Sequence, residues 1–234
     1  MKKENLFIEH IPAILWGKPS DKLFIAVHGN MSRKDDAAIV ILSEEAIAKE
    51  YQVLSFDLPD HGDRKGRGEI CKVQNCVSDL TAVMNHAQTV SNNINVFACS
   101  MGAYFSLLSY KDIMLGQCLF LSPVLNMSDL INNMMSLFNI SEKRLETEKE
   151  IDTPVGQTLY WDYNSYVKSH PILYWNVPTA ILYGSDDNLT EFTIISDFVN
   201  RFHCSLEVLE HGEHYFHTSE QLSYFRLWLK NSIQ

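Results

Sequence analysis

The sequence has little that would mark a membrane-spanning, secreted or nucleic-acid-binding protein. No stretch approaches the about 20 consecutive apolar residues that a transmembrane helix requires. The amino-terminal segment Met1–Asn5 is basic, but no apolar signal run or cleavage site accompanies it. Basic residues are scarce, because 19 Lys and Arg stand against 29 Asp and Glu and give a net charge of −10. This charge disfavours nucleic acid and an anionic membrane surface as partners.

Cysteine is also sparse, and its spacing matches no disulfide framework. An odd number of cysteines argues further against a fully paired set. We therefore expect free thiols in a reducing, cytoplasmic environment. The five cysteines are Cys71, Cys76, Cys99, Cys118 and Cys204.

The chain has enough apolar residues for a folded domain, with 46% of its 234 residues hydrophobic. Strand-like apolar runs alternate with helical patterns, which predicts an α/β fold with a mostly parallel twisted sheet and helices on both faces. The predicted strands are Leu6–Ile8 and Ile14–Trp16 with Pro12 between them, Lys22–His28, Tyr51–Asp57, Val96–Ala98, Gln117–Pro123, Thr179–Ser185 and Ser205–Glu210. The predicted helices are Asp35–Glu50, Val73–Ala87, one starting at Met101, Glu191–Phe202 and Ser219–Lys230.

One region interrupts this alternation. No strand is evident between Val124 and about Asn176, where an apolar helical stripe precedes a charged run and an aromatic cluster. We interpret residues 124–176 as a small helical lid insertion within a single domain spanning residues 1–234. An ordinary helical crossover with a solvated charged face is the alternative.

A candidate nucleophile lies in the sequence from Asn95 to Ala103. A short buried strand ends there at Ser100, and a helix begins at once. Ala98 and Gly102 are small, as a sharp strand-to-helix turn requires, because larger side chains on either side of the serine would clash. The backbone N–H of Met101 would then point at an oxyanion beside the serine hydroxyl.

A serine nucleophile needs a base and an acid that orients the base. Sites in parallel sheets form at the carboxyl ends of strands, where Asp186 and Asp187 are the candidate acids. The candidate bases His211, His214 and His217 follow the last predicted strand. The loop after the strand that ends at His28 should supply a second oxyanion donor, and the backbone N–H of Asn30 is the first one placed for it.

The three histidines near the carboxyl terminus could instead suggest a metal site, since their spacing is three and three. Gly212 makes a continuous helical face there improbable, and no thiolate or carboxylate set completes a zinc site, so we expect no metal. His28 and His61 lie in predicted turns, where we expect them to hydrogen-bond the backbone and not to act as bases.

Together these segments resemble the α/β-hydrolase superfamily of single-domain serine hydrolases, with its carboxylesterase-like, monoacylglycerol-lipase-like and serine-aminopeptidase-like members. The resemblance extends over nearly the whole chain. It rests on five motifs in the family's order: His28-Gly29, Asp57–Gly62, Ala98–Gly102, Tyr183–Asp187 and Gly212–Phe216. Ala98 and Asp60 stand where the family pattern has glycine.

The resemblance selects Asp187 as the acid and His214 as the base. It implies a serine hydrolase that cleaves a small-molecule carboxylic ester through an acyl-enzyme intermediate, with Ser100 as the nucleophile and no cofactor. A thioesterase or an aminopeptidase-type peptidase would use the same three residues. A peptidase would also need a carboxylate near the site to bind the substrate amine. A non-catalytic binding protein on this fold is an alternative of another class, and the oligomeric state, monomer or homodimer, stays open.

The predicted insertion also offers candidates for an apolar substrate pocket. Met127 and Met134 fall on its helical stripe, and Tyr160 and Trp161 belong to its aromatic cluster. Methionine and aromatic side chains suit an apolar acyl or alcohol group, although such a stripe is more often plain core.

Overall fold

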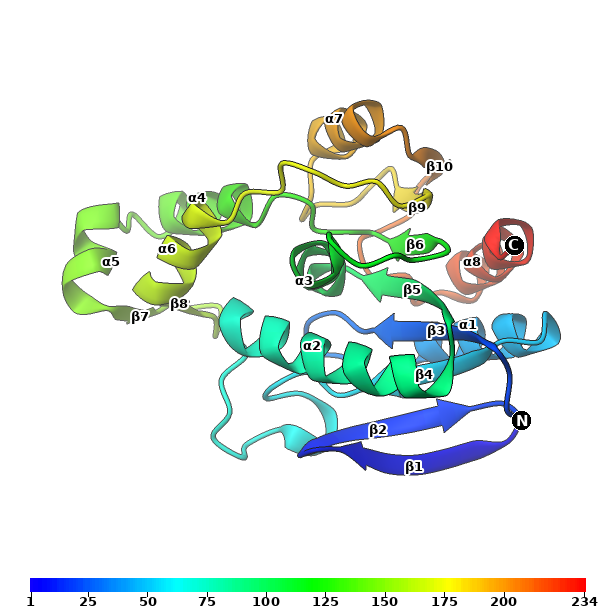
Figure 1. The fold of residues 1–234 in the computed structure, drawn as a ribbon. Helices are drawn as coiled ribbons and strands as arrows, with labels where there is room; N and C mark the ends of the chain where they lie inside the picture. Colours follow the sequence, from blue (N-terminus) through cyan, green and yellow to red (C-terminus); the bar gives the residue numbers. More distant parts are fainter.

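The computed structural model describes all 234 residues and contains a sheet of eight strands (Figure 1). The strand order is β1-β2-β4-β3-β5-β6-β9-β10. β2 pairs antiparallel with both β1 and β4, and all other neighbouring strands are parallel. The strands are β1 (Lys3–Ile8), β2 (Ile11–Trp16), β3 (Lys22–Val27), β4 (Gln52–Phe56), β5 (Asn93–Cys99), β6 (Cys118–Leu121), β9 (Thr179–Gly184) and β10 (Ser205–Leu209).

Helices cover both faces of the sheet, which confirms the predicted fold class (Figure 1). Side chains alternate between the faces along each strand. In β3, Leu23, Ile25 and Val27 belong to the core shared with α2, α3 and α7, whereas Phe24 and Ala26 belong to the core shared with α1 and α8. These helices are α1 (Ala37–Ala48), α2 (Val73–Val90), α3 (Met101–Tyr110), α7 (Phe192–Phe202) and α8 (Ser219–Ser232). No helix is both long and apolar enough to cross a lipid bilayer.

The insertion between β6 and β9 projects beyond the carboxyl edge of the sheet (Figure 1). It consists of α4 (Met127–Leu137), α5 (Glu142–Glu148), β7 (Glu150–Asp152), β8 (Thr158–Tyr160) and α6 (Trp161–Ser169). The start of α2 anchors it, because Lys72 Nζ lies 2.9 Å from Asp162 Oδ2 and Gln74 Nε2 donates to the Asp162 carbonyl oxygen at 3.1 Å.

The expectation of no strand in this region is wrong, because β7 and β8 form an antiparallel hairpin. Ile151 and Leu159 face each other in it and are buried. Each strand has only three residues, so one apolar position per strand carries the whole pattern. A period of two cannot be recognised from a single position.

The start of the chain also differs from the prediction. Pro12 lies inside β2, opposite Phe7, and not between the two strands. The turn is formed by Glu9 and His10, and Glu9 has a positive φ of 54°. Pro12 fits because it is near the start of the strand, where a missing N–H donor is tolerated. Its carbonyl oxygen still accepts a hydrogen bond from the Asp57 N–H at 3.0 Å.

Candidate active site

Ser100 occupies the sharp turn between β5 and α3. Its backbone has φ 50° and ψ −124°, a strained conformation that non-glycine residues rarely adopt. Its N–H donates to the Leu121 carbonyl oxygen at 3.1 Å. Its own carbonyl oxygen accepts from Ala103 at 3.1 Å and from Val124 at 3.0 Å. These bonds fix the serine at the carboxyl edge of the sheet.

The turn tolerates only small residues beside the serine. A Cβ added at Gly102 would lie 2.5 Å from the His28 carbonyl oxygen and 2.9 Å from that of Val27. Any larger residue would therefore force α3 away from β3. Ala98 is completely buried on the other side of the turn. This packing explains the small residues that the sequence places around Ser100.

The loops after β9 and β10 bring an acid and a histidine to this turn. A Cβ at Gly184 would lie 2.2 Å from the carbonyl oxygen of Gly212, so the two loops are in direct backbone contact. The N–H of Asp186 donates to the same carbonyl oxygen at 2.8 Å. Glycines at both positions allow this approach, which sets Asp187 beside His214.

Ser100, His214 and Asp187 form a continuous hydrogen-bonded row. His214 Nε2 lies 2.8 Å from Ser100 Oγ, and His214 Nδ1 lies 2.7 Å from Asp187 Oδ2. The side chain of Asp187 is fully buried, while 17% of the His214 side chain is exposed. Asp187 Oδ1 accepts hydrogen bonds from the N–H groups of Leu189 at 2.8 Å and Thr190 at 3.0 Å. Such donors stabilise the charged carboxylate.

The neighbouring candidates face elsewhere. Asp186 accepts a hydrogen bond from Ser185 at 3.1 Å and lies 3.6 Å from His211, whose side chain is 83% exposed. His217 Nδ1 is bonded to the Tyr215 carbonyl oxygen at 2.8 Å. The structure has no group of three His, Cys, Asp or Glu side chains arranged to hold a metal ion.

The loop after β3 lies against the serine. A Cβ at Gly29 would be 3.0 Å from Ser100 Cβ. The N–H of Asn30 donates no hydrogen bond within the protein. Met101 is the first residue of α3, where an N–H has no acceptor in its own helix. Two backbone donors on either side of the serine are thus free for an anion.

Two buried histidines, His28 and His61, contact this loop, and both hydrogen-bond the backbone as predicted. His28 Nδ1 donates to the Gly29 carbonyl oxygen at 2.7 Å, and its Nε2 accepts from the Leu58 N–H at 3.0 Å. Burial lowers the pKa of His28 to about 4, so its ring is neutral at neutral pH. His61 Nδ1 is bonded to the Pro59 carbonyl oxygen at 2.8 Å.

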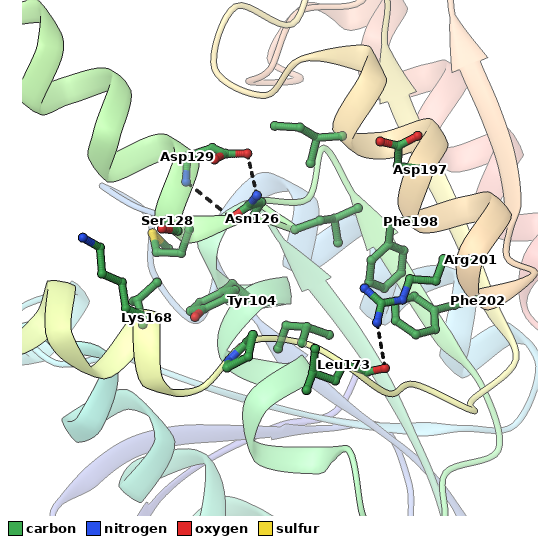
Figure 2. A pocket seen from close by; sticks show the side chains of 16 residues that line it. Tyr104, Asn126, Ser128, Asp129, Lys168, Leu173, Asp197, Phe198, Arg201 and Phe202 are labelled. Atoms are coloured by element: carbon green, nitrogen blue, oxygen red, sulfur yellow. Dashed lines mark hydrogen bonds between the residues drawn. The ribbon is translucent and has the colours of Figure 1, made fainter.

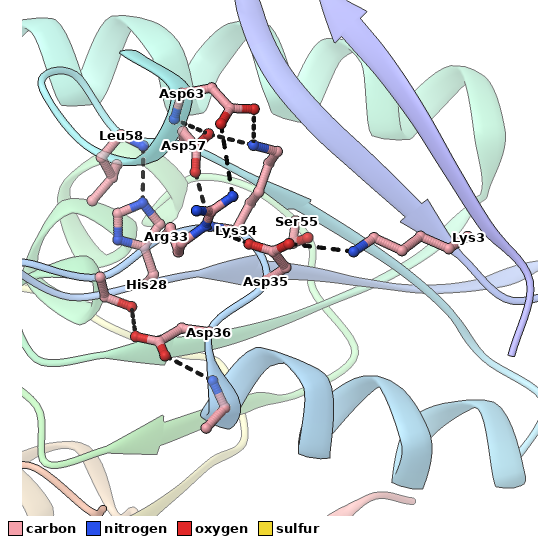
Figure 3. Close-up of polar contacts among 12 residues, drawn as sticks. Lys3, His28, Arg33, Lys34, Asp35, Asp36, Ser55, Asp57, Leu58 and Asp63 are labelled. Atoms are coloured by element: carbon pink, nitrogen blue, oxygen red, sulfur yellow. Dashed lines mark hydrogen bonds and ion pairs between the residues drawn. The ribbon is translucent and has the colours of Figure 1, made fainter. Parts of the chain in front are cut away.

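A buried lysine joins the loops that follow β3 and β4, and the sequence offered no signal for it (Figure 3). Lys34 Nζ contacts Asp57 Oδ2 and Asp63 Oδ2, each at 2.6 Å. The N–H groups of Lys34 and Asp63 also donate to the Asp57 carboxylate, both at 2.9 Å. Burial lowers the pKa of Lys34, but hydrogen bonds with both carboxylates outweigh it and raise that pKa.

A cavity of about 470 Å³ lies between the insertion, α3 and α7 (Figure 2). Tyr104 and Leu125 line it near the serine, since Tyr104 is one helical turn beyond Ser100 and Leu125 follows Val124, which bonds to the Ser100 carbonyl oxygen. Of the predicted pocket residues, Met127 lines this cavity.

The other three predicted pocket residues do not line that cavity. Met134 and Trp161 pack against the main core instead. Tyr160 lies under the Lys72 ammonium, 4.2 Å from its ring centre, and so helps to hold the insertion on α2.

Comparison with known proteins identifies the fold. The chain matches no protein-family profile and no curated protein sequence. Among solved structures, it is similar to Est1E from Butyrivibrio proteoclasticus with ferulic acid bound (18% identity, 97% of this chain and 96% of that chain, TM-score 0.80). It is also similar to mouse alpha/beta hydrolase domain-containing protein 10 (13%, 100% and 98%, TM-score 0.79). A third similar structure is the Pyrococcus furiosus esterase Pf2001 (19%, 100% and 91%, TM-score 0.66).

These likenesses extend from one end of the chain to the other. The protein therefore has the α/β-hydrolase fold, which its sequence motifs predicted.

Proposed function

We propose that the protein is a serine hydrolase that cleaves a carboxylic ester through an acyl-enzyme intermediate. The observation that carries the proposal is the row from Ser100 Oγ to His214 Nε2 at 2.8 Å and from His214 Nδ1 to Asp187 Oδ2 at 2.7 Å. Its place on the strained turn of an α/β-hydrolase fold supports the same reading. The similar structures include one described as an esterase.

In the first half of the reaction, Ser100 Oγ attacks the ester carbonyl carbon while His214 Nε2 takes the hydroxyl proton. The carbonyl oxygen becomes an oxyanion, which the N–H groups of Asn30 and Met101 stabilise. Asp187 holds the imidazole and stabilises its charged form. His214 then gives the proton to the leaving alcohol, and an acyl-serine ester remains.

In the second half, water replaces the alcohol. His214 takes a proton from the water as it attacks the acyl carbon, and a second oxyanion forms in the same place. His214 then returns the proton to Ser100 Oγ, and the carboxylic acid leaves. Besides the ester and water, the cycle uses Ser100, His214, Asp187 and the two backbone donors.

The finer part of the proposal is the identity of the leaving group. It is an alcohol for an ester, an amine for a peptide and a thiol for a thioester. A peptidase of the aminopeptidase type would need a free carboxylate near the serine. Of the four candidate carboxylates, Glu142 pairs with Lys168 at 2.7 Å, Glu146 with Lys143 at 2.9 Å and Glu148 with Arg144 at 2.8 Å, whereas Glu150 has no ion pair. Three of the four are thus engaged on the surface, and an ester is the substrate that we propose. A thioester keeps the same chemistry, and comparing an acyl-CoA with a p-nitrophenyl ester of equal acyl length separates the two.

The test uses Ser100→Ala with Ser109→Ala as its matched control. Ser109 lies on α3 and its buried hydroxyl has no hydrogen-bond partner, so its removal should leave the helix and the site intact. We expect Ser100→Ala to lose all measurable p-nitrophenyl butyrate hydrolysis and fluorophosphonate labelling at an unchanged melting temperature. The control should keep both. Labelling that persists in Ser100→Ala would contradict the proposal, and absence of labelling in the unmodified protein would favour a non-catalytic binding protein.

A further inference from the structure

Two cysteines outside the proposed active site face each other at the start of α2. Cys71 Sγ and Cys76 Sγ are 3.6 Å apart. Cys76 is the fourth residue of α2 and is completely buried, whereas Cys71 precedes the helix and is partly exposed. A small oxidant can therefore reach the Cys71 sulfur, whereas the Cys76 sulfur is shielded in the core.

The pair can close with a small movement. A disulfide requires an S–S distance of about 2.05 Å, so the sulfurs need to approach by roughly 1.5 Å. The chain before Cys71 contains Gly66 and Gly68, and no atom lies within 4 Å of a Cβ built at either position. This stretch faces open space, but Glu69 is held by Arg64 and the Ile70 carbonyl oxygen by Asn75 of α2, so the shift must come from Cys71 itself.

His61 makes one sulfur the nucleophile. Its Nε2 lies 3.1 Å from Asn30 Oδ1, and with Nδ1 on the Pro59 carbonyl oxygen both ring nitrogens face oxygens, which suits the charged imidazolium. Burial lowers the pKa of His61, but hydrogen bonds with Cys71 and the Pro59 carbonyl outweigh it and raise that pKa. The raised pKa of His61 favours protonation of the ring, and a protonated ring near Cys71 favours its thiolate.

Disulfide formation by an oxidant needs one reactive thiolate and one partner thiol, and the pKa values of the two sulfurs differ in this way. A hydrogen bond from Cys76 lowers the pKa of Cys71, and His61 lowers it further. Burial opposes both effects, and the resulting pKa is about 6. Burial raises the pKa of Cys76. Near neutral pH the partly exposed Cys71 thus favours the thiolate, and the buried Cys76 favours the thiol. Burial also raises the pKa of Cys99, Cys118 and Cys204, so these cysteines stay unreactive thiols.

We infer that Cys71 and Cys76 form an oxidation site that a hydroperoxide converts to an intramolecular disulfide. The Cys71 thiolate attacks one peroxide oxygen, the O–O bond breaks, and the departing alkoxide takes up a proton, which leaves a sulfenic acid. The Cys76 sulfur then attacks Cys71 Sγ as its own proton leaves. The S–S bond forms, the S–O bond breaks, and water is released. Two thiols are oxidised, and one hydroperoxide is reduced to an alcohol and water.

The experiment treats the full-length protein with hydrogen peroxide and maps its thiols by mass spectrometry without a reductant. Trypsin cuts after Lys72, so the disulfide should join fragments 68–72 and 73–111. Because the second fragment also contains Cys99, the Cys76→Ser variant decides which sulfur is the partner. It should lose the cross-link and instead give a dimedone adduct on Cys71.

The matched control is Cys204→Ser, which should keep the cross-link. In the unmodified protein, iodoacetamide at pH 7 should label Cys71 at least on the order of tenfold faster than Cys204. His61→Gln should slow this labelling several-fold, because it removes the positive ring. Five free thiols after peroxide treatment, or a cross-link that survives in Cys76→Ser, would overturn the inference. Neither readout depends on Ser100 or on hydrolysis.

Discussion

Asp186 and Asp187 are adjacent in the chain but have different partners. The Asp187 carboxylate is buried and lies 2.7 Å from His214 Nδ1, while Asp186 is exposed and lies near His211. We predict that Asp187→Asn lowers kcat for p-nitrophenyl butyrate by about 10³- to 10⁴-fold. The amide can still accept from the N–H groups of Leu189 and Thr190. It presents an N–H to the imidazole, however, and so stabilises the wrong tautomer.

The control for this prediction is Asp186→Asn, which removes the same charge one residue earlier. Its activity should remain within about threefold of the unmodified enzyme, because the side chain has no contact with His214 and surface charges act weakly over distance. Steady-state kinetics at pH 8 measure both variants. Equal losses in the two variants, or a larger loss in Asp186→Asn, would mean that the acid has been assigned to the wrong residue.

At the scale of single residues, the sequence indicated which residues are candidates for the site better than it indicated which residues they contact. Ser100 is identifiable because small neighbours and a strand-to-helix change surround it. The choice of Asp187 over Asp186 rested on the family resemblance of Tyr183–Asp187 alone, since both residues follow the same strand. The structure separates them through the contact of Gly184 with Gly212, which depends on two loops that are distant in sequence.

At the scale of elements, Lys34 links the loop after β3 to the loop after β4 (Figure 3). We predict that Lys34→Met lowers the free energy of unfolding by about 3 kcal/mol, because it leaves Asp57 charged, buried and without its cation. The loop that carries Asn30 should also become less ordered, so kcat should fall even where the protein remains folded. Urea denaturation and esterase kinetics measure the two effects.

The matched control is Lys143→Met on α5. Lys143 also pairs with a carboxylate, Glu146, at 2.9 Å, but its side chain is 83% exposed. Water already screens that pair, so the urea midpoint should not change. If both variants had the same midpoint, the buried network would not be a stabilising link between the loops.

The elements that the sequence predicted correctly are those with a buried apolar run or a long helical stripe. The parallel strands are continuous apolar runs, and the stripe along α2 repeats over enough residues to be recognised. Pro12 and the β7–β8 hairpin were misread because few residues define each of them. Lys34 could not be predicted at all, since its role exists only once two separate loops are brought together.

At the scale of the whole molecule, a cavity lies between the insertion and the sheet domain (Figure 2). Its volume of about 470 Å³ is within the usual range of small-molecule sites, roughly 300–1,000 Å³. Apolar side chains such as Leu125 and Phe198 line it, and Arg201 lies at its edge, where Nη2 donates to the Leu173 carbonyl oxygen at 3.1 Å. None of Ser100, His214 and Asp187 lines this space. We propose that it receives the acyl chain of the substrate, which would reach it from Ser100 past Tyr104.

If this cavity holds the acyl chain as proposed, filling it should shorten the acyl chain that the protein accepts. Ser128 on α4 lines the cavity, and Ser136 on the same helix is exposed and does not. We predict that Ser128→Trp lowers kcat/KM for p-nitrophenyl octanoate on the order of tenfold or more, while p-nitrophenyl acetate stays within about twofold, because each excluded methylene forfeits about 0.8 kcal/mol of burial. Ser136→Trp should change neither. An equal loss on both esters would point to general damage, and an unchanged chain-length profile would place the acyl group elsewhere.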